Sequence, residues 1–359
     1  MLAVLGPGSQ PYLGTFFYYA VGDLNGDGFV DVAMSIWGMD QLSIFMGNDA
    51  GSFQPVVNNE TWISPAQLLI TRAGSPARQV LAVAGDSNGA SNEDAGLVIG
   101  EVDDNGILNI IDAPPGNSYS QGAIAADLNC DGLTDFVALN WVSESIDSTD
   151  VYLGSGDGGW SPGSLATEAY DIGVGDFTDD GIPDLLVTFW TDPPEFDVLP
   201  GKGDGTFSTV PIVTGIDAGQ FVTCTIGDLN EDGMLDLLLF VSGGQPAFVL
   251  FGRGDGTFSA GPMLSSLTSS LYSVALQDLN GDGHLDYVAA DIFGGHVYVA
   301  LGNGDGTFQA ESVVSYTAIP DGGQGVWVGI ADVNNDGRPD LYVTDQNTGN
   351  LSFLINQCR

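Results

Sequence analysis

A nine-residue acidic segment, repeated six times, constrains this chain more than any other feature. Its clearest copy, Asp278–Asp286, reads DLNGDGHLD. Oxygen-bearing side chains occupy positions 1, 3, 5 and 9 of the segment, and glycine occupies position 6. Alternate residues of a curled loop point inward, and glycine allows the backbone to bend with a positive φ. The spacing therefore predicts a loop that gathers oxygen atoms around one point.

All six copies keep this spacing, which is the ligand order that a hard cation requires. The predicted ligands are the side chains at positions 1, 3, 5 and 9 and the backbone carbonyl at position 7: Asp23, Asn25, Asp27, Phe29, Asp31; Asp127, Asn129, Asp131, Leu133, Asp135; Asp176, Thr178, Asp180, Ile182, Asp184; Asp228, Asn230, Asp232, Met234, Asp236; Asp278, Asn280, Asp282, His284, Asp286; and Asp332, Asn334, Asp336, Arg338, Asp340. An all-oxygen set suits Ca²⁺, whereas Mg²⁺ demands a tighter octahedron and Zn²⁺ prefers nitrogen or sulfur. We therefore expect six structural Ca²⁺ ions. Plain solvated turns are the weaker alternative, because a turn needs only glycine and one Asx residue.

The charge balance supports ligand carboxylates over a merely solubilising surface. The chain has 47 acidic residues against six Lys and Arg, and a formal net charge of −41. Asp far outnumbers Glu, although solubility alone would be served equally well by Glu. Six divalent ions would still leave the protein strongly negative. Electrostatic repulsion therefore argues against nucleic acid and anionic membranes as partners.

Cysteine content and hydropathy define the expected location of the protein. Cys130, Cys224 and Cys358 fit neither a disulfide framework nor a zinc motif. No run of 18 apolar residues occurs, so we expect no membrane insertion. Leu2–Leu5 is too short and lacks the basic residues of a signal peptide. Since calcium is plentiful outside cells, we expect an extracellular or cell-surface protein whose signal peptide is not present in this chain.

The acidic segments recur about every 50 residues, except that the first interval is twice as long. A second unit without its acidic loop therefore lies in that interval. Its strands are expected at Gln67–Thr71, Val80–Ala84, Leu97–Val102 and Ile107–Ile111. The alternative, in which Asp86–Asp94 is the missing loop, lacks the acid at position 5 and the glycine at position 6. Arg72 and Arg78 flank the place of the missing ion, so they either replace its charge or are simply two exposed arginines.

Each unit contains four short alternating strands and no helical periodicity, which is typical of a propeller blade. Leu2–Leu5 resembles a fourth strand, and the chain ends on a segment that resembles a third strand, at Leu351–Asn356. The two ends together make one complete unit. We therefore predict an all-β, seven-bladed propeller spanning residues 1–359 as a single domain, closed by pairing of the N-terminal strand with the last blade.

The repeated motif, Gly-Asp-(Leu/Phe)-Asn-x-Asp-Gly-x-x-Asp followed by Leu-Gly-x-Gly-Asp-Gly-Thr-Phe, resembles the FG-GAP repeat, also called the VCBS repeat. The resemblance covers nearly the whole chain, and only the second unit departs from it. It implies a seven-bladed propeller like that at the head of integrin α subunits, in secreted bacterial proteins and in some fungal lectins. Cell adhesion and lectin-like binding are the functions that this resemblance implies.

The glycine-rich part of the motif is predicted to be a hairpin between the third and fourth strands, with its closing aromatic packed between blades. It occurs at Gly47–Phe53, Gly154–Trp160, Gly201–Phe207, Gly252–Phe258 and Gly302–Phe308. A second metal site at its Asp is the less favoured alternative. One copy contains Arg253-Gly254-Asp255, an adhesion tripeptide by sequence. Other copies have Lys202 and Asn303 in place of Arg253, so the turn needs no adhesion role to explain it.

Strand direction alternates within a blade, so the acidic loops and the glycine-rich turns should share one face, here named the loop face. The remaining connections form the opposite face and vary in sequence, so specificity is expected there. Trp37, Trp141 and Trp190 occupy equivalent positions at the exit of the second strand, and Trp62 and Tyr119 lie in other connections of this face. Aromatic side chains beside Asp, Asn and Gln suit carbohydrate or protein ligands. Packing of the three equivalent Trp between blades is an equal alternative.

An enzyme is less favoured than a binding protein. The only histidines are His284, inside an acidic loop, and His296. No Ser or Cys lies in a nucleophile motif, and no glycine-rich phosphate loop precedes a helix. Acid pairs are so common that they identify no catalytic site. A calcium-dependent polysaccharide lyase, a glycosidase, and a structural module of a larger surface protein remain alternatives to a binding propeller.

Overall fold

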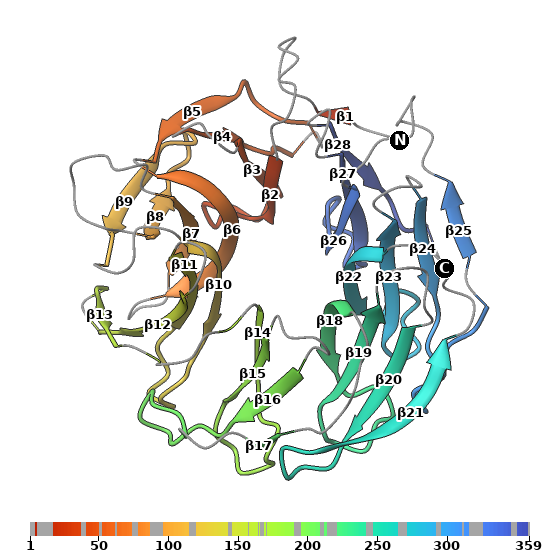
Figure 1. The fold of residues 1–359 in the computed structure, drawn as a ribbon. Coiled ribbons are helices and arrows are strands. Elements are labelled where there is room, and N and C mark those ends of the chain that lie inside the picture. The colour runs from red at the N-terminus through yellow and green to blue at the C-terminus, as the bar shows by residue number, and fades with distance from the viewer. Residues whose placement is uncertain are drawn as a thin grey trace.

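The computed structural model describes residues 4–5, 17–36, 41–49, 52–61, 63–73, 78–86, 96–114, 120–142, 146–156, 158–163, 165, 169, 171–189, 195–208, 212–213, 221–241, 247–264, 271–291, 296–310, 312–315, 326–345 and 350–357. Within these ranges the chain forms 28 β-strands. The strands make seven antiparallel sheets of four strands each, arranged in a ring around a central opening (Figure 1). The predicted seven-bladed propeller is therefore confirmed.

The blades follow one another along the chain. Their strands are β2 (Phe17–Gly22), β3 (Asp31–Ile36), β4 (Gln41–Phe45) and β5 (Val57–Glu60) in blade 1; β6 (Ser64–Ala73), β7 (Arg78–Asp86), β8 (Leu97–Val102) and β9 (Leu108–Asp112) in blade 2; β10 (Ser120–Ala126), β11 (Asp135–Val142), β12 (Ile146–Gly154) and β13 (Trp160–Pro162) in blade 3; β14 (Asp171–Gly175), β15 (Asp184–Phe189), β16 (Glu195–Leu199) and β17 (Ile212–Val213) in blade 4; β18 (Phe221–Gly227), β19 (Asp236–Val241), β20 (Ala247–Gly252) and β21 (Phe258–Leu264) in blade 5; and β22 (Leu271–Gln277), β23 (Asp286–Asp291), β24 (His296–Ala300) and β25 (Ser312–Ser315) in blade 6.

Blade 7 joins the two ends of the chain. It contains β26 (Val326–Ala331), β27 (Asp340–Asp345) and β28 (Asn350–Leu354), and its outer strand is β1 (Val4–Leu5). In the antiparallel register of β1 and β28, Val4 lies opposite Ser352 and Leu5 opposite Leu351. The predicted closure of the ring is therefore confirmed for these residues.

The blade that lacks an acidic loop is present as predicted. Strands β6 and β7 of this blade pair along their whole length. Ser64 lies opposite Asp86 at one end and Ala73 lies opposite Arg78 at the other, so both strands are longer than expected. Asp86 belongs to the end of β7, which agrees with the rejection of an acidic loop starting there. The rest of that rejected segment, 87–94, lies outside the described residues.

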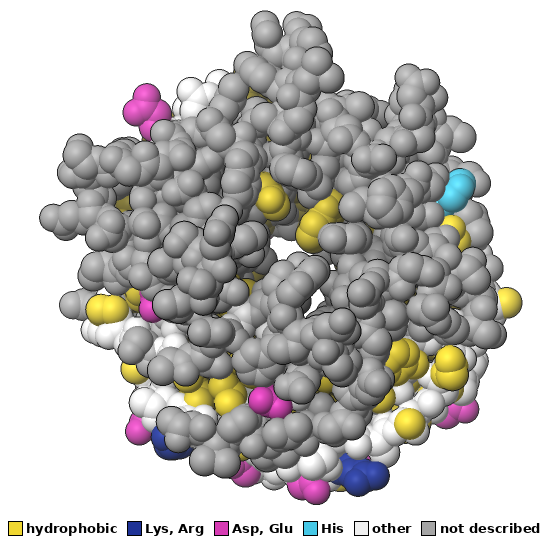
Figure 2. All heavy atoms as spheres, in the orientation of Figure 1, with side chains coloured by type: hydrophobic (Ala, Val, Ile, Leu, Met, Phe, Trp, Pro, Cys, Tyr) yellow, Lys and Arg dark blue, Asp and Glu magenta, His cyan; other side chains and the backbone are white. Residues whose placement is uncertain are grey.

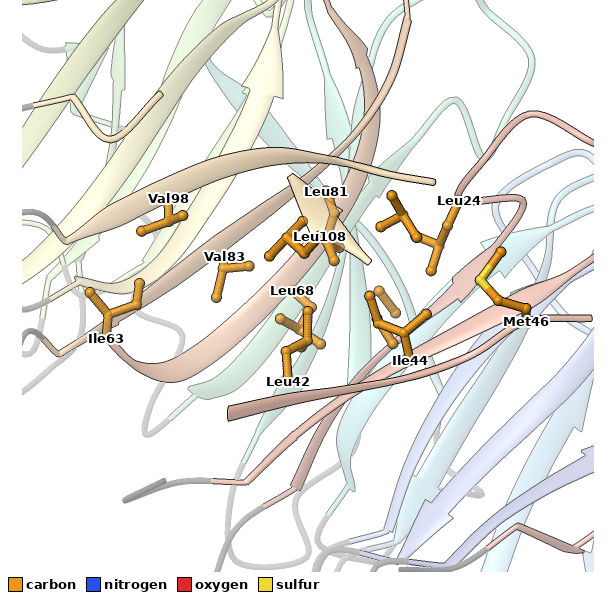
Figure 3. Close-up of a cluster of buried hydrophobic side chains, with 13 residues drawn as sticks. Leu24, Leu42, Ile44, Met46, Ile63, Leu68, Leu81, Val83, Val98 and Leu108 are labelled. Atoms are coloured by element: carbon orange, nitrogen blue, oxygen red, sulfur yellow. The ribbon is translucent and has the colours of Figure 1, made fainter. Parts of the chain in front are cut away.

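Apolar side chains on both faces of each sheet form the core between neighbouring blades. In one cluster, Leu42 and Ile44 of blade 1 meet Leu81 and Val83 of blade 2 (Figure 3). Leu24, at position 2 of the first acidic loop, is 1% exposed and belongs to the same cluster. The core of the propeller therefore extends to the base of the acidic loop and fixes its position.

The seam between blades 7 and 1 has its own apolar cluster. Val32 of β3 packs with Leu351 and Phe353 of β28, and the rings of Phe53 and Phe353 stack with centroids 6.0 Å apart. No helix capable of crossing a membrane is found in the part of the chain that the structure describes.

Candidate metal loops and the opposite face

The aspartate at position 9 connects each acidic loop to the turn between strands 3 and 4 of the same blade. In blade 1, Asp31 is fully buried; its Oδ2 accepts the Leu24 N–H at 2.9 Å and its Oδ1 accepts the Gly47 N–H at 2.7 Å. The other five loops repeat both bonds, with Oδ1 accepting from Gly154, Gly201, Gly252, Gly302 and Asn356. Loops and turns therefore share one face, as predicted.

The five glycines at these turns are required by a close approach of two backbone segments. A Cβ atom at Gly252 would collide with the carbonyl oxygen of Leu235, at position 8 of the loop. Gly47, Gly154, Gly201 and Gly302 meet the equivalent carbonyl in the same way. The glycine that begins each turn therefore makes room for the backbone of the acidic loop.

The aspartates at positions 1 and 5 hold the loop backbone in its curl. Asp23 Oδ1 accepts the Asp27 N–H at 3.1 Å and Asp23 Oδ2 accepts the Gly28 N–H at 2.9 Å, while Asp27 Oδ1 accepts the Phe29 N–H at 2.8 Å. The same three bonds recur in the other five loops. The curl predicted from the alternation of side chains is therefore present in every loop.

Position 4 adopts a left-handed backbone, which the spacing of the ligand residues does not predict. Gly26 and Gly281 have φ values of 82° and 79° there. The other four loops place a non-glycine residue at a positive φ: Cys130, Asp179, Glu231 and Asn335. Such a conformation is uncommon for residues with a Cβ. Glycine at position 4 of two loops is the sequence feature from which this conformation could have been predicted.

The oxygen atoms available in the loops suit a hard cation, which prefers oxygen ligands. A carboxylate has about four acceptor sites, and the bonds above leave unused sites on the Asp side chains at positions 1, 5 and 9. In blade 4, the buried Oγ1 of Thr178 at position 3 has no hydrogen bond of good geometry, although it lies close enough to Asp184 to favour the charged form of that carboxyl. Within the described ranges, however, no three His, Cys, Asp or Glu side chains are arranged to hold a metal ion. The loop carboxylates would have to draw together around an ion.

Burial makes the charge at position 9 unfavourable. Desolvation raises the pKa of Asp31 to about 6 against the effect of its two backbone hydrogen bonds, and the charges of Asp27 and Asp23 raise it further. Asp236 behaves in the same way, with a pKa of about 6. Desolvation also raises the pKa of the four equivalent carboxyls, in Asp135, Asp184, Asp286 and Asp340. Each loop thus contains a carboxylate that a nearby cation would stabilise.

Hydrogen bonds link the loops of neighbouring blades across the seams. The position-2 carbonyl of one loop accepts from the next blade: Phe177 from the Gly256 N–H at 2.9 Å, Leu229 from the Gly306 N–H at 2.8 Å, and Leu279 from the Asn356 side-chain amide at 2.7 Å. Position 4 also reaches the following loop. The Asn335 amide donates to the Gly28 carbonyl, and Glu231 pairs with His284 and raises its pKa. These contacts join blades 4 to 7 in succession and blade 7 to blade 1, and at two of the seams they join two acidic loops directly.

Blade 2 has a hairpin where the other blades have an acidic loop. Arg78 Nη1 lies 2.5 Å from Glu101 Oε1 in the same blade, and Arg72 Nε lies 3.4 Å from Gln79 Oε1. The Arg72 carbonyl accepts the hydroxyl of Thr134 from the loop of blade 3. The arginines thus lie on the loop face and have partners of their own. That they replace a lost ion stays a prediction.

In three glycine-rich turns, the Asp side chain accepts hydrogen bonds from within its own turn. Oδ1 of Asp255 accepts the Thr257 N–H at 3.0 Å and the Thr257 hydroxyl at 2.5 Å, and Asp204 and Asp305 repeat both bonds. The closing aromatic packs across a seam: the ring of Phe258 lies 6.1 Å from that of Phe177 in the preceding blade. These contacts agree with a plain hairpin, and the Asp of Arg253-Gly254-Asp255 is engaged within its own turn.

Most aromatic residues predicted for the ligand site lie outside the described residues: Trp37, Trp62, Tyr119 and Trp190. Trp141 is part of β11, where its backbone pairs with Asp147 of β12. In Figure 2, described hydrophobic side chains are seen beside the central opening.

Comparison with known proteins agrees with this architecture. Residues 176–239 and 278–343 match the family model of the FG-GAP-like repeat. No curated protein matches the chain in sequence. The protein is therefore a β-propeller of seven blades, and two parts of it, residues 176–239 and 278–343, match the FG-GAP-like repeat.

Several solved structures share the fold at low sequence identity. A lectin from Agrocybe aegerita that recognises non-reducing terminal N-acetylglucosamine is 18% identical, with a TM-score of 0.58 over 89% of each chain. Virginiamycin B lyase from Staphylococcus aureus is 13% identical, with a TM-score of 0.55 over 99% of each chain. A rhamnogalacturonan lyase from Bacillus licheniformis is 14% identical, with a TM-score of 0.51 over 95% of this chain and 72% of that one. At these identities the similarities establish the fold alone.

Proposed function

We propose that the protein is an extracellular, calcium-stabilised propeller that binds a carbohydrate through the face opposite its acidic loops, without chemical conversion of the ligand. The observation that carries this proposal is the use of the loop face for structure. There, each position-9 carboxylate bonds to two backbone N–H groups, and the Asp of three glycine-rich turns bonds within its turn. The variable connections on the other face would then determine which ligand is bound.

Calcium would be held in each loop by the oxygens at positions 1, 3, 5, 7 and 9. The ion would supply positive charge to carboxylates that burial and mutual repulsion penalise, as at Asp31 and Asp236. Because the acidic loops are hydrogen-bonded to each other between blades 5 and 6 and between blades 7 and 1, binding in one of these loops would also stiffen its partner. The ions have a structural role in this proposal, which suits a calcium-rich extracellular setting.

The ligand site is assigned to the aromatic residues of the opposite face. Trp37, Trp141 and Trp190 occupy equivalent positions in blades 1, 3 and 4. Aromatic rings stack on the C–H faces of a sugar, and neighbouring Asp, Asn and Gln side chains bind its hydroxyls. Equivalent sites on one rigid ring would act together, so a repeated glycan would bind with greater avidity than a single sugar. The sugar-binding lectin with the same fold supports a carbohydrate as the class of ligand.

A polysaccharide and glycan array, probed with the calcium-loaded protein, tests the proposal. We expect retention of at least one glycan, no release of reducing sugar and no unsaturated product. Binding should weaken after chelation, because the loops support the blades that carry the site. Retention of no glycan together with capture of a purified protein ligand would contradict the carbohydrate assignment, and unsaturated products would show that the protein is a lyase.

A further inference from the structure

Two hydrogen bonds join the acidic loops of neighbouring blades directly. Across the seam between blades 5 and 6, the Glu231 carboxylate pairs with the His284 ring. Across the seam between blades 7 and 1, the Asn335 side-chain amide donates to the Gly28 carbonyl. In both cases, the residue that reaches across the seam occupies position 4 of its own loop. Position 4 therefore connects one loop to the next at two of the seams.

Each of these bonds ends beside predicted ligand positions in both loops. Position 4 lies in the chain between the ligands at positions 3 and 5. Gly28 stands at position 6 of the loop of blade 1, between two ligand positions, and His284 stands at position 7, whose backbone carbonyl is itself a predicted ligand. Because the carboxylates of a loop would have to draw together around an ion, the residues next to them would move as well. Ion binding in one loop would therefore alter its bond to the neighbouring loop.

The backbone at position 4 is strained wherever the residue is not glycine. Glu231 and Asn335 have φ values of 59° and 56°, in the left-handed region that favours glycine. Cys130 and Asp179 share this conformation in blades 3 and 4, so the conformation alone identifies no coupling. Blades 1 and 6 have glycine at this position, which fits it without strain but has no side chain to reach the next blade. Among the described loops, a position-4 side chain bonded to the next loop is found in blades 5 and 7.

The surroundings of the Glu231–His284 pair leave it little room. A Cβ atom at Gly304, in the glycine-rich turn of blade 6, would lie 2.5 Å from His284 Nδ1 and 2.8 Å from Glu231 Oε1. The turn therefore approaches the pair closely. The exposed fractions of the His284 and Glu231 side chains are 35% and 49%, so the pair is only partly open to solvent. A shift of either loop would therefore change the geometry of this bond.

We infer that the acidic loops bind calcium as two coupled pairs, blades 5 and 6 and blades 7 and 1, and that position 4 carries the coupling. This inference rests on the proposed calcium binding and specifies its regulation. An ion that orders one loop of a pair would hold the cross-seam bond in place and lower the cost of ordering the partner loop. The calcium affinity of each loop should therefore be higher when its partner is occupied. The loops of blades 3 and 4 would fill without this coupling.

Coupling between blades 7 and 1 has a further consequence because their seam closes the ring. Blade 7 is completed by β1, and Val32 of blade 1 packs with Leu351 and Phe353 of blade 7 across this seam. Ions in the two loops would hold the bond between Asn335 and Gly28 in place beside these apolar contacts. Calcium would therefore fasten the seam at which the two ends of the chain meet.

A double-mutant cycle with a site-resolved calcium titration tests the inference. Hydrogen exchange, followed by mass spectrometry of peptides covering 23–31 and 332–340, reports the calcium midpoint of each loop in the full-length protein. Asp332→Asn weakens ion binding in the loop of blade 7 and keeps the shape of the side chain. We expect it to raise the calcium midpoint of the loop of blade 1 about three- to tenfold, the size of one hydrogen bond. In the Asn335→Gly background, the same substitution should leave that midpoint unchanged.

The loops of blades 5 and 6 provide a second cycle. Asp228→Asn should raise the midpoint of the loop of blade 6 by a similar factor, and Glu231→Gly should abolish this effect. Cys130→Gly is the matched control, because it places glycine at position 4 of blade 3 and removes a free thiol instead of a cross-seam bond. It should leave the midpoints of the other loops unchanged. If it shifts the next loop as much as Glu231→Gly does, glycine itself is the cause and the inference is overturned.

The remaining outcomes separate this inference from the proposed function. Coupling is reciprocal, so Asp23→Asn should raise the midpoint of the loop of blade 7, and this variant replaces Asp332→Asn if the latter does not fold. An unchanged midpoint in the partner loop, or a shift that persists after Asn335→Gly, would overturn the inference while leaving calcium binding intact. If calcium changes the exchange of none of the loops, the calcium assignment itself is rejected, and the inference with it.

Discussion

Asp340 and Asn356 fasten the last acidic loop to the segment that follows β28. Oδ1 of Asp340 accepts the Asn356 N–H at 2.7 Å, and the Asn356 amide donates to the Leu279 carbonyl of the preceding blade at 2.7 Å. In the five other blades with an acidic loop, glycine stands in the place of Asn356. Asn356 therefore holds the last acidic loop against the segment after β28 and also links blade 7 to blade 6.

Removing a position-9 carboxylate should destabilise the fold strongly. In Asp236→Ala, the N–H groups of Leu229 and Gly252 lose their acceptor in a buried site. Each unsatisfied buried group costs about 1–3 kcal/mol, so we expect a loss of roughly 2–6 kcal/mol in the free energy of unfolding, measured by urea denaturation. Asp255→Ala is the control, because Asp255 is exposed in its turn and should lose less than about 1 kcal/mol. Equal losses in the two variants would contradict the structural role of position 9.

Deleting residues 1–8 should lower the melting temperature sharply. The deletion removes β1, exposes the edge of β28 and leaves the ring without its closing strand. Differential scanning calorimetry measures the effect, and deletion of Cys358 and Arg359 serves as the control. An unchanged melting temperature after the N-terminal deletion would mean that the β1–β28 pairing does not hold the ring.

The predicted ions should be calcium and should number six. We expect metal analysis of the purified protein to find about six Ca²⁺ per chain, and chelation with EDTA to lower the melting temperature and raise sensitivity to protease. The reason is that each loop gathers three Asp carboxylates that repel one another when no ion is present. Zinc in the metal analysis, or an unchanged melting temperature in EDTA, would reject the calcium assignment.

Without calcium, the stability of the protein should fall as pH rises from about 4 to about 6. Burial raises the pKa of Asp31 and Asp236 from 3.8 to about 6, so in this range the folded chain binds more protons than the unfolded chain. Folding therefore loses stability with each increase in pH until these carboxyls are ionised in both states. With calcium the trend should reverse, because the ion binds ionised carboxylates.

Melting temperatures of calcium-free and calcium-loaded protein across this pH range test the sign of the effect. Asp204, Asp255 and Asp305 do not disturb the comparison, because hydrogen bonds to Thr lower their pKa and place their contribution below this window. A calcium-free protein that becomes more stable between pH 4 and pH 6 would contradict the prediction.

Single replacements of Trp37, Trp141 and Trp190 by Ala should separate ligand contact from packing. If these residues bind ligand, each variant keeps its melting temperature and loses about five- to thirtyfold in glycan affinity, since a stacked aromatic contact contributes on the order of 1–2 kcal/mol. If they fill space between blades, each variant melts several degrees lower and keeps its affinity. Calorimetry and glycan binding on the same preparations distinguish the two outcomes.

The sequence predicted the parts of the fold that repeat within one segment. The spacing of Asp and Gly in 278–286 was enough to predict the loop curl, and the spacing between segments revealed blade 2 without its loop. Contacts between segments that lie far apart in the sequence leave no comparable pattern of residues. Neither the bond from Gly252 to Asp236 nor the pair of Glu231 and His284 follows from local spacing, because each depends on how strands or blades pack.

Pairing of β1 with β28 also determines the order in which the blades can fold during synthesis. A chain that emerges from the ribosome N-terminus first can complete blades 1 to 6 in succession, since each is continuous in sequence. Blade 7 must wait for its last strand, whereas its outer strand β1 is made before blade 1. During synthesis β1 therefore has no partner, and a protein bound to it, or a bulky tag fused ahead of it, would delay the final step for the whole ring.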